Sequence, residues 1–199
     1  MKKQVVVIHG GDLFETYEEY LEYLRAYELT LEKLNQKRWG ENLADALGSE
    51  FQVIRPTMPN KRNARYVEWK IWFEKLLPYV EDGISIVGGS LGGTFVAKYL
   101  AENTFPKNIA ATFLVAAPYD MEGAGQTLMD FVLPDDLDGL AKQGGKIFLY
   151  HSEDDPVVPF ADAKKYQKDL PNATPRVFQD RGHFNQEEFP ELVEDIQNL

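Results

Sequence analysis

The stretch of sequence that decides the fold is Ile84-Ser85-Ile86-Val87-Gly88-Gly89-Ser90-Leu91-Gly92-Gly93-Thr94. It predicts a buried strand, a glycine-rich turn and the start of a helix, and its centre, Gly88-x-Ser90-x-Gly92, matches a nucleophile elbow. A serine in such an elbow projects from a strained turn, and the residues two before and two after it lie so close together that only small side chains fit. The dipole of the following helix favours negative charge beside that serine. The motif therefore predicts that Ser90 is a catalytic nucleophile.

Two other interpretations of this turn lead away from catalysis. A phosphate-binding loop requires a lysine directly before Thr94, and this chain has Gly93 there. A purely structural glycine-rich turn stays open on the sequence alone. The position of the motif, between an apolar run and a helical segment in the middle of the chain, favours the nucleophile.

Short β-branched runs alternate with segments of helical periodicity along the whole chain. The expected strands are Val5–Ile8, Phe51–Ile54, Ile84–Val87, Ala110–Val115, Lys146–Tyr150 and Arg176–Phe178. Nearly all of them are apolar through most of their length, as strands covered on both faces are. The 199 residues suit one domain. We therefore expect a single α/β-hydrolase domain over 1–199, with a compact parallel sheet of five to six strands and helices on both faces.

The residues that follow the first strand predict an inserted helix at about 13–38. Thr16 and Glu19 fit a capping box. After them an apolar stripe recurs at spacings of three and four, formed by Tyr17, Tyr20, Leu24, Tyr27, Leu31 and Leu34. The insertion is anchored beside the active-site edge, so we expect a lid, while extra core and a partner surface remain alternatives. Further helices are expected from Trp39 to Leu47, ending at Gly48, and over about 63–77.

The partners of the nucleophile are predicted from chain order, which in this fold is nucleophile, acid, histidine. Of the three histidines, His183 comes last, after the final strand, and is the expected base. His9 and His151 are interpreted as structural, with His9 bracing its loop by hydrogen bonds. Asp155 follows the fifth strand and is the expected acid. Asp154 is a candidate too, interpreted as a solvated turn residue, and Asp120 is a more distant rival.

An oxyanion hole needs two backbone N–H groups aimed at one point. Leu91, directly after the nucleophile, is expected to supply one of them. The loop His9-Gly10-Gly11 is expected to supply the other, from Gly11 or, failing that, from Gly10. The sequence shows neither a metal-ligand spacing nor a dinucleotide-binding motif, so we expect no cofactor.

Composition narrows the classes of partner and compartment. Thirty-two acidic against 21 basic residues give a formal net charge of -11, which disfavours binding to nucleic acid. The absence of cysteine excludes disulfides and a cysteine nucleophile. The apolar run at Val5–Ile8 is too short for a signal-peptide core or a membrane span. We therefore expect a cytoplasmic protein without a membrane span.

Three motifs together resemble the retinoblastoma-binding-protein-9-type family of small serine hydrolases. They are Gly88-Gly89-Ser90-Leu91-Gly92-Gly93, Asp155-Pro156-Val157-Val158-Pro159 and Gly182-His183-Phe184-Asn185-Gln186-Glu187-Glu188-Phe189. The resemblance spans nearly the whole chain and implies the same triad and hydrolysis of small esters. The tyrosine-rich segment before Trp39 departs from that family, where a short loop is expected.

The sequence thus predicts a serine hydrolase that cleaves a small ester or amide through an acyl-enzyme on Ser90. Transfer of the acyl group to an acceptor other than water is one alternative. A protein-binding module with a vestigial triad is another, because aromatic residues in the helices suit either a pocket or a partner surface.

Overall fold

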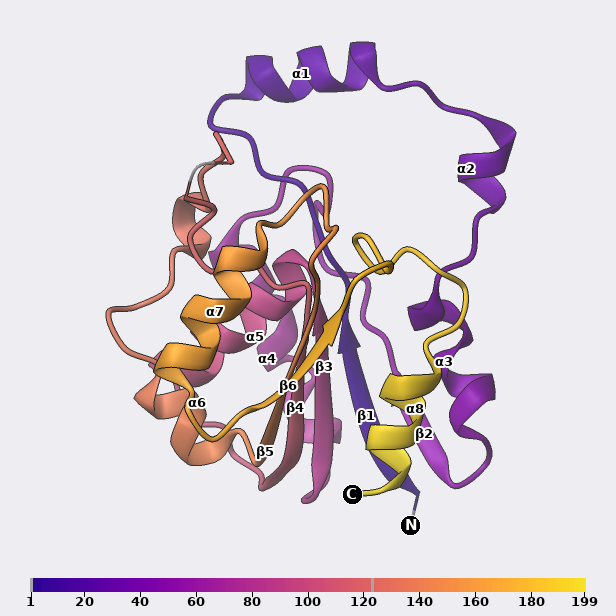
Figure 1. Cartoon of the computed structure of the whole chain (residues 1–199), viewed down its shortest axis with the longest axis vertical. Coiled ribbons are helices and arrows are strands. Elements are labelled where there is room, and N and C mark those ends of the chain that lie inside the picture. The colour runs from indigo at the N-terminus through magenta and orange to yellow at the C-terminus, as the bar shows by residue number, and fades with distance from the viewer. Residues whose placement is uncertain (1, 123) are drawn as a thin grey trace.

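The computed structural model describes residues 2–122 and 124–199, and its centre is a six-stranded sheet in which every pair of neighbours is parallel (Figure 1). The strand order is β2-β1-β3-β4-β5-β6. The strands are β1 (Lys3–Ile8), β2 (Phe51–Ile54), β3 (Ile84–Gly89), β4 (Ile109–Val115), β5 (Lys146–Ser152) and β6 (Thr174–Phe178). All six lie where the sequence predicts them, with ends shifted by two residues or fewer. Their carboxyl ends share one edge of the sheet, which α/β proteins use for their sites.

Helices cover both faces of the sheet, in two unequal layers (Figure 1). The helices are α1 (Tyr17–Ala26), α2 (Leu31–Asn35), α3 (Trp39–Leu47), α4 (Tyr66–Glu74), α5 (Leu91–Glu102), α6 (Asp138–Gln143), α7 (Phe160–Asp169) and α8 (Pro190–Gln197), with short 3-10 turns at Leu77–Tyr79 and Met129–Phe131. The layer with α4, α5, α6 and α7 packs on one face, and α3 and α8 pack on the other.

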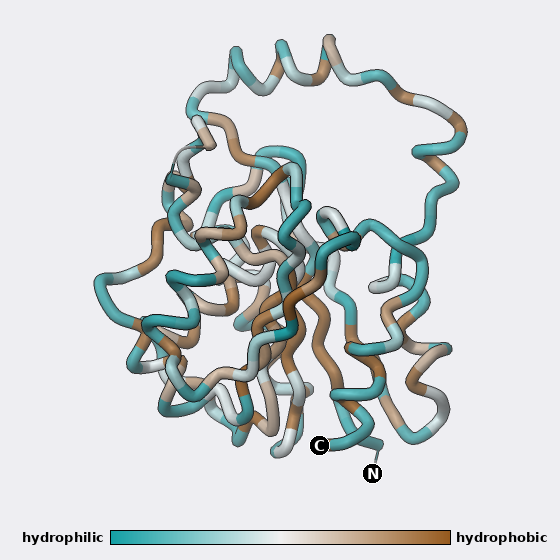
Figure 2. Tube along the Cα trace, viewed as in Figure 1, coloured by the Kyte–Doolittle hydropathy of each residue, from teal (hydrophilic) through white to brown (hydrophobic). Residues whose placement is uncertain are grey.

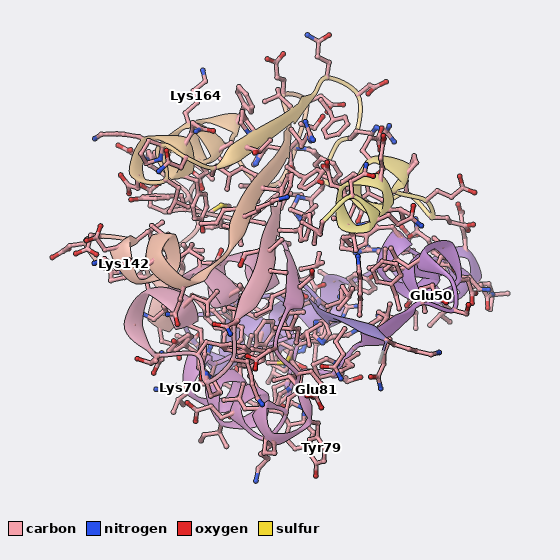
Figure 3. All side chains as sticks on the ribbon, turned by 90° about the horizontal axis from the view of Figure 1, so that it is seen from below. Glu50, Lys70, Tyr79, Glu81, Lys142 and Lys164 are labelled. Carbon is pink, nitrogen blue, oxygen red and sulfur yellow. The ribbon has the colours of Figure 1, made fainter. Side chains whose placement is uncertain are left out.

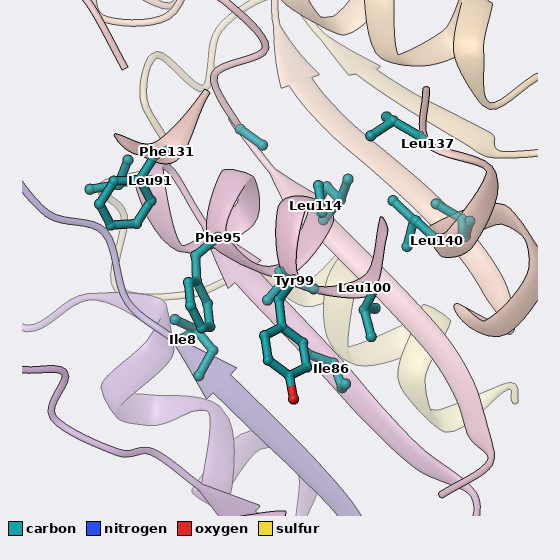
Figure 4. Close-up of a cluster of buried hydrophobic side chains, with 14 of the residues drawn as sticks. Ile8, Ile86, Leu91, Phe95, Tyr99, Leu100, Leu114, Phe131, Leu137 and Leu140 are labelled. Atoms are coloured by element: carbon teal, nitrogen blue, oxygen red, sulfur yellow. The ribbon is translucent and has the colours of Figure 1, made fainter. Parts of the chain in front are cut away.

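Alternation along the strands explains this double cover. In β1, Val6 and Ile8 belong to the core under α5, whereas Val5 and Val7 belong to the core under α3 and α8. Successive side chains of a strand point to opposite faces, so a strand that is apolar throughout must be covered twice. Figure 2 shows the strands as the most hydrophobic part of the trace. Figure 4 shows Leu91 and Phe95 of α5 among the buried side chains of the larger core.

Two predicted helices lie close to their expected bounds. Helix α3 runs from Trp39 to Leu47 and ends at Gly48, whose φ of 80° is a backbone conformation that favours glycine. Helix α4 is shorter than the predicted span 63–77, because the chain changes to a 3-10 turn near its end. Trp69 and Phe73 of α4 point inward as predicted and are buried. Each helix holds a loop through a tryptophan, since Trp39 Nε1 of α3 donates to Phe184 O and Trp69 Nε1 of α4 donates to Pro59 O.

The inserted segment 13–38, which we call the strap, differs from its prediction. The capping box of Thr16 and Glu19 is present, but the helix breaks after Ala26, and the chain is extended at Tyr27 before Thr30 caps α2. Neither α1 nor α2 contains a buried residue. The predicted stripe has four members between 44% and 78% exposed, which are Tyr17, Leu24, Leu31 and Leu34.

The interpretation of this segment as extra core, which requires a buried stripe, is therefore wrong. The strap arches away from the sheet (Figure 1), and most of the stripe faces solvent. Its contacts with the body include those of Tyr23 of α1 and of one stripe member, Tyr27. Tyr23 accepts a hydrogen bond from Arg62 at 2.8 Å, and the Arg62 guanidinium lies 4.8 Å from the Tyr27 ring centroid. Among the described residues, no helix is long and apolar enough to cross a membrane.

Candidate active site

Ser90 stands on a strained turn between β3 and α5. Its φ of 53° and ψ of -128° place a non-glycine residue in a region that serine rarely adopts. The turn is held by a hydrogen bond from Ser90 N to Val115 O at 2.7 Å. A Cβ atom at Gly88 would lie 2.5 Å from Gly92 O, and one at Gly92 would lie 2.4 Å from Ile8 O. Both positions therefore require glycine, as the elbow motif predicts.

The structure brings the three predicted triad residues into one chain of hydrogen bonds. His183 Nε2 lies 2.9 Å from Ser90 Oγ. On the other side of the ring, His183 Nδ1 lies 2.8 Å from Asp155 Oδ2 and 3.1 Å from Oδ1. An ionised carboxylate only accepts hydrogen bonds, so Nδ1 carries a proton in the neutral ring and Nε2 is free to accept the serine proton. This order of donors and acceptors is the one that an activated serine needs.

The environment of Asp155 keeps it ionised. Its side chain is 0% exposed, and Oδ1 accepts hydrogen bonds from Val157 N at 2.8 Å and Val158 N at 3.0 Å. Burial raises the pKa of Asp155, but His183 lowers it by hydrogen bond and charge, and the two backbone N–H groups lower it further. The net result is a pKa below the ordinary value. Asp155 is thus charged at neutral pH and orients the imidazole.

Asp154, which the sequence indicates is a solvated turn residue, makes hydrogen bonds that join two loops of the site. Its side chain is exposed, but Oδ1 accepts hydrogen bonds from Gly182 N at 2.9 Å and from Ser152 Oγ. Ser152 Oγ in turn accepts a hydrogen bond from Arg181 N at 3.0 Å. These bonds lower the pKa of Asp154. The carboxylate therefore joins the loop of the acid to the loop of His183.

The two other histidines have structural partners, as predicted. His9 Nδ1 lies 2.6 Å from Gly10 O, and His9 Nε2 accepts a hydrogen bond from Met58 N at 2.9 Å. His151 Nε2 lies 3.0 Å from Val158 O. Burial is the main cause of the lowered pKa of both rings, which keeps them neutral. His9 braces its loop, and His151 braces the turn that contains Asp155.

The rival acid Asp120 is engaged elsewhere. Both of its carboxylate oxygens accept hydrogen bonds from Lys165 Nζ, at 2.7 and 2.6 Å. Burial alone raises the pKa of Asp120, but the hydrogen bonds from Lys165 and from the Glu122 N–H, together with the charge of Lys165, bring the pKa below its ordinary value. His183 makes its carboxylate contacts with Asp155 instead. The geometry therefore favours Asp155 over Asp120.

The loop after β1 packs directly against the elbow. A Cβ atom at Gly10 would lie 3.0 Å from Ser90 Cβ, and one at Gly11 would lie 2.8 Å from Lys61 O. The N–H of Asp12 is used, because it donates to Lys61 O at 2.8 Å. Within the described part of the chain, the N–H groups of Gly10, Gly11 and Leu91 donate no such hydrogen bond. Those three groups are therefore available to a ligand.

Two supporting contacts have no signal in the sequence that would reveal them. Trp39 Nε1 donates to Phe184 O at 2.9 Å, and Trp39 N donates to Gln186 O at 2.8 Å. Both bonds span about 145 residues of chain and hold the loop after His183. Trp39 and Asp154 reach this loop from different elements, and only the assembled fold brings them together. No group of three or more potential metal ligands occurs among the residues described.

Comparison with known proteins agrees with the fold. The ydeN gene product from B. subtilis superposes with a TM-score of 0.74 at 20% identity, over 99% of this chain and 98% of that chain. An esterase from Exiguobacterium antarcticum gives a TM-score of 0.62 at 16% identity, over 98% and 91%. Est1E from Butyrivibrio proteoclasticus gives 0.64 at 16% identity, over 99% and 86%. The fold is that of the α/β-hydrolases.

Structural likeness at such low identity shows the fold but not the family, which a family model identifies. No curated protein sequence matches the chain. The model of the serine hydrolase family matches residues 31–197, which is most of the chain and includes Ser90, Asp155 and His183. The match begins inside the strap. The chain therefore belongs to the serine hydrolase family.

Proposed function

We propose that the protein hydrolyses small carboxylic esters through an acyl-enzyme on Ser90. The observation that carries this proposal is the continuous chain from Ser90 Oγ to His183 Nε2 at 2.9 Å and from His183 Nδ1 to Asp155 Oδ2 at 2.8 Å. Its members come from three separate loops at the carboxyl edge of the sheet. Membership in the serine hydrolase family supports the same reaction class.

The first half-reaction forms the acyl-enzyme. His183 Nε2 takes the proton of Ser90 Oγ as the oxygen attacks the carbonyl carbon of the ester. The imidazolium that results is stabilised by the buried charge of Asp155. His183 then gives the proton to the leaving alcohol, and the carbon–oxygen bond to that alcohol breaks. The acyl group stays on Ser90.

The second half-reaction repeats these steps with water. His183 takes a proton from water, which attacks the acyl carbon, and the proton returns to Ser90 Oγ as the acid leaves. In both halves the carbonyl oxygen becomes an oxyanion. The N–H of Leu91, at the start of α5, and the N–H of Gly11 are its proposed donors, with Gly10 in reserve. The availability of all three groups supports this assignment.

The finer family assignment stays part of the proposal. The motifs at Ser90, Asp155 and His183 resemble the retinoblastoma-binding-protein-9-type hydrolases, and two structural neighbours are an esterase and Est1E. Together these support a carboxylesterase-like activity on small-molecule esters. Amides with good leaving groups fit the same chemistry.

Labelling by a fluorophosphonate probe tests this proposal and separates it from a vestigial triad. An activated serine attacks the phosphorus and displaces fluoride, whereas an unactivated serine does not react. We expect one equivalent of label on Ser90, located by mass spectrometry of the labelled peptide. The exposed Ser49 offers a matched control, because Ser49→Ala should keep full labelling while Ser90→Ala should lose it. Wild-type protein that stays unlabelled would refute the proposal.

A further inference from the structure

Cationic side chains are concentrated in one loop of this acidic protein. The chain has a net charge of -11. Yet residues 55–65, which connect β2 to α4, contain four cations and no Asp or Glu. The cations are Arg55, Lys61, Arg62 and Arg65. We call this segment the basic loop.

The basic loop lies directly against the loop that contains Gly10 and Gly11. Met58 N donates to His9 Nε2 at 2.9 Å, and Asp12 N donates to Lys61 O at 2.8 Å. Gly11 approaches Lys61 O so closely that a Cβ atom there would lie 2.8 Å from it. Lys61 and Arg55 also add to the lowering of the pKa of His9 that burial dominates. The backbone of the basic loop thus lies beside the proposed oxyanion hole, and the charges of Lys61 and Arg55 act on the neighbouring His9.

A further cation, Arg38, lies in the chain next to a residue that contacts the loop of His183. Arg38 precedes Trp39, whose indole N–H donates to Phe184 O at 2.9 Å. The Trp39 ring also lies 3.5 Å from the position of a Cβ atom at Gly89, just before the nucleophile. Arg38, the N-cap of α3, therefore directly precedes the contact with the loop of the base, while the basic loop packs against the loop of Gly10 and Gly11.

The charges of these cations are only partly compensated. Arg55 lies 3.9 Å from Glu41, and Arg62 lies 3.5 Å from Asp12, both pairs being well exposed. Such long, exposed pairs neutralise charge weakly. Among the described residues, neither the Lys61 ammonium nor the Arg38 guanidinium has a carboxylate within 4.0 Å, although the backbone N–H of Arg38 donates to Glu41 Oε2 at 3.0 Å. On the strap, Glu18 pairs with Arg25 and Glu19 caps α1, so these glutamates are engaged within the strap.

We propose that Arg38, Arg55, Lys61 and Arg62 form a subsite for an anionic group of the substrate. The substrate is then a small ester that carries a carboxylate or a phosphate besides its scissile bond. This inference rests on the proposed function. A locally positive rim on a negative protein concentrates anionic ligands at the site and repels them elsewhere, which raises the rate of productive encounter.

Matched chromogenic esters test the subsite. The first pair is mono-p-nitrophenyl glutarate, which has a free carboxylate, and its neutral methyl ester. The second pair is 4-acetoxybenzoate and its methyl ester, in which the charge lies on the leaving group. At low salt we expect kcat/KM to be about 10-fold higher for the anionic ester than for its neutral partner in at least one of the two pairs, the pair whose charge reaches the subsite. That preference should fall at about 1 M salt, where charges are screened beyond roughly 3 Å.

Two double variants identify the residues responsible. Arg55→Gln with Lys61→Gln removes two exposed charges whose side chains donate no hydrogen bond within the described chain. Lys142→Gln with Lys164→Gln is the control, since both lysines project outward from α6 and α7 (Figure 3). We expect the first variant to lower the anionic-to-neutral ratio about 10-fold and the control to keep the wild-type ratio. The subsite is overturned if the anionic-to-neutral ratio of kcat/KM is at or below one for both pairs in the wild type. It is also overturned if the first double variant keeps the wild-type ratio.

The outcome also separates this inference from the proposed function. If no ester is cleaved and fluorophosphonate does not label Ser90, the hydrolase proposal fails. Binding of glutarate and of inorganic phosphate is then measured by NMR, with glutaramide as the neutral probe. Weaker binding of both anions in the first double variant, but not in the control variant, supports the subsite. Equal binding of glutarate and glutaramide overturns it.

Discussion

Asp154 Oδ1 accepts a hydrogen bond from the backbone N–H of Gly182 at 2.9 Å. This bond joins the residue before Asp155 to the residue before His183, so the loops of the proposed acid and base are held together by a side chain that takes no part in the reaction. Gly182 has a φ of 51°, which glycine adopts at little cost. The separation of acid and base is thus fixed at two adjacent points, one of them outside the triad.

The serine is the first position to test by kinetics. Ser90→Ala removes the nucleophile and leaves the rest of the site in place. We expect ester turnover to fall by roughly three to six orders of magnitude. The assay is p-nitrophenyl acetate hydrolysis by pure protein whose fold is checked by circular dichroism. Turnover near that of the wild type would contradict the whole mechanism.

The acid is tested by a change that preserves shape. Asp155→Asn leaves an amide whose N–H₂ favours the wrong tautomer of His183, so we expect kcat to fall by about four orders of magnitude. The measurement is kcat for a short chromogenic ester. Asp120→Asn is the matched comparison, because Asp120 bonds to Lys165 and not to His183. A larger loss at Asp120 than at Asp155 would show that the acid is misplaced.

Two substitutions of Asp154 distinguish the effect of its hydrogen bond to Gly182 from the effect of its charge. Asp154→Asn keeps an oxygen that can accept from Gly182, so kcat should change less than about 10-fold. Asp154→Ala loses that oxygen and frees the His183 loop, so kcat should fall about 10- to 100-fold, as small misplacements of catalytic groups do. Asp180→Ala, at an exposed residue of the neighbouring turn, is the control. Equal kcat values for the alanine variant and wild type would refute the positioning role.

The sequence predicted the position of each strand along the chain to within two residues, because doubly covered parallel strands are continuous apolar runs. It also predicted the residues at the triad positions, because the elbow and the chain order are local signals. It did not predict the Asp154–Gly182 bond or the contact of Trp39 with Phe184, since both depend on where distant loops meet. The exposure of the strap's stripe could not be predicted for a related reason. Periodicity indicates an amphipathic helix, but it does not show whether any surface lies opposite that helix.

Asp195 gives a prediction for stability and its pH dependence. It accepts hydrogen bonds from Arg176 at 2.8 and 2.6 Å and from Tyr150 at 2.5 Å, so it links α8 to β5 and β6. The hydrogen bond from Arg176 is the main cause of its lowered pKa. Asp195→Asn should therefore reduce the free energy of unfolding at pH 7 by about 1–2 kcal/mol, the partly exposed Arg176 limiting the effect.

The pH dependence of that difference has a definite sign. A lowered pKa in the folded state means that the carboxylate stabilises the fold above its unfolded pKa of about 4, and that this contribution is lost as pH falls through the lower folded value. Urea unfolding at pH 7 and at about pH 3 should therefore show a smaller difference between wild type and variant at the acid pH. Asp138→Asn, on the exposed α6 pair with Lys142, serves as control. A difference that grows on acidification would contradict the assignment.

The strap is tested by replacing residues 16–37 with a short Gly/Ser linker. Both ends of the strap are anchored beside the site, one through Asp12 and the other through Trp39, and α1 passes over the carboxyl edge of the sheet (Figure 1). Because α1 and α2 bury no residue, the variant should fold, with a free energy of unfolding within about 1 kcal/mol of wild type. If the strap is a lid, the preference among acyl chain lengths should shift while short-ester turnover persists. Tyr23→Phe, which removes the hydroxyl bonded to Arg62, should shift it in the same direction, whereas Tyr17→Phe, on the exposed face, should not. Unchanged chain-length selectivity in a folded linker variant would rule out the lid and leave the exposed stripe as a partner surface.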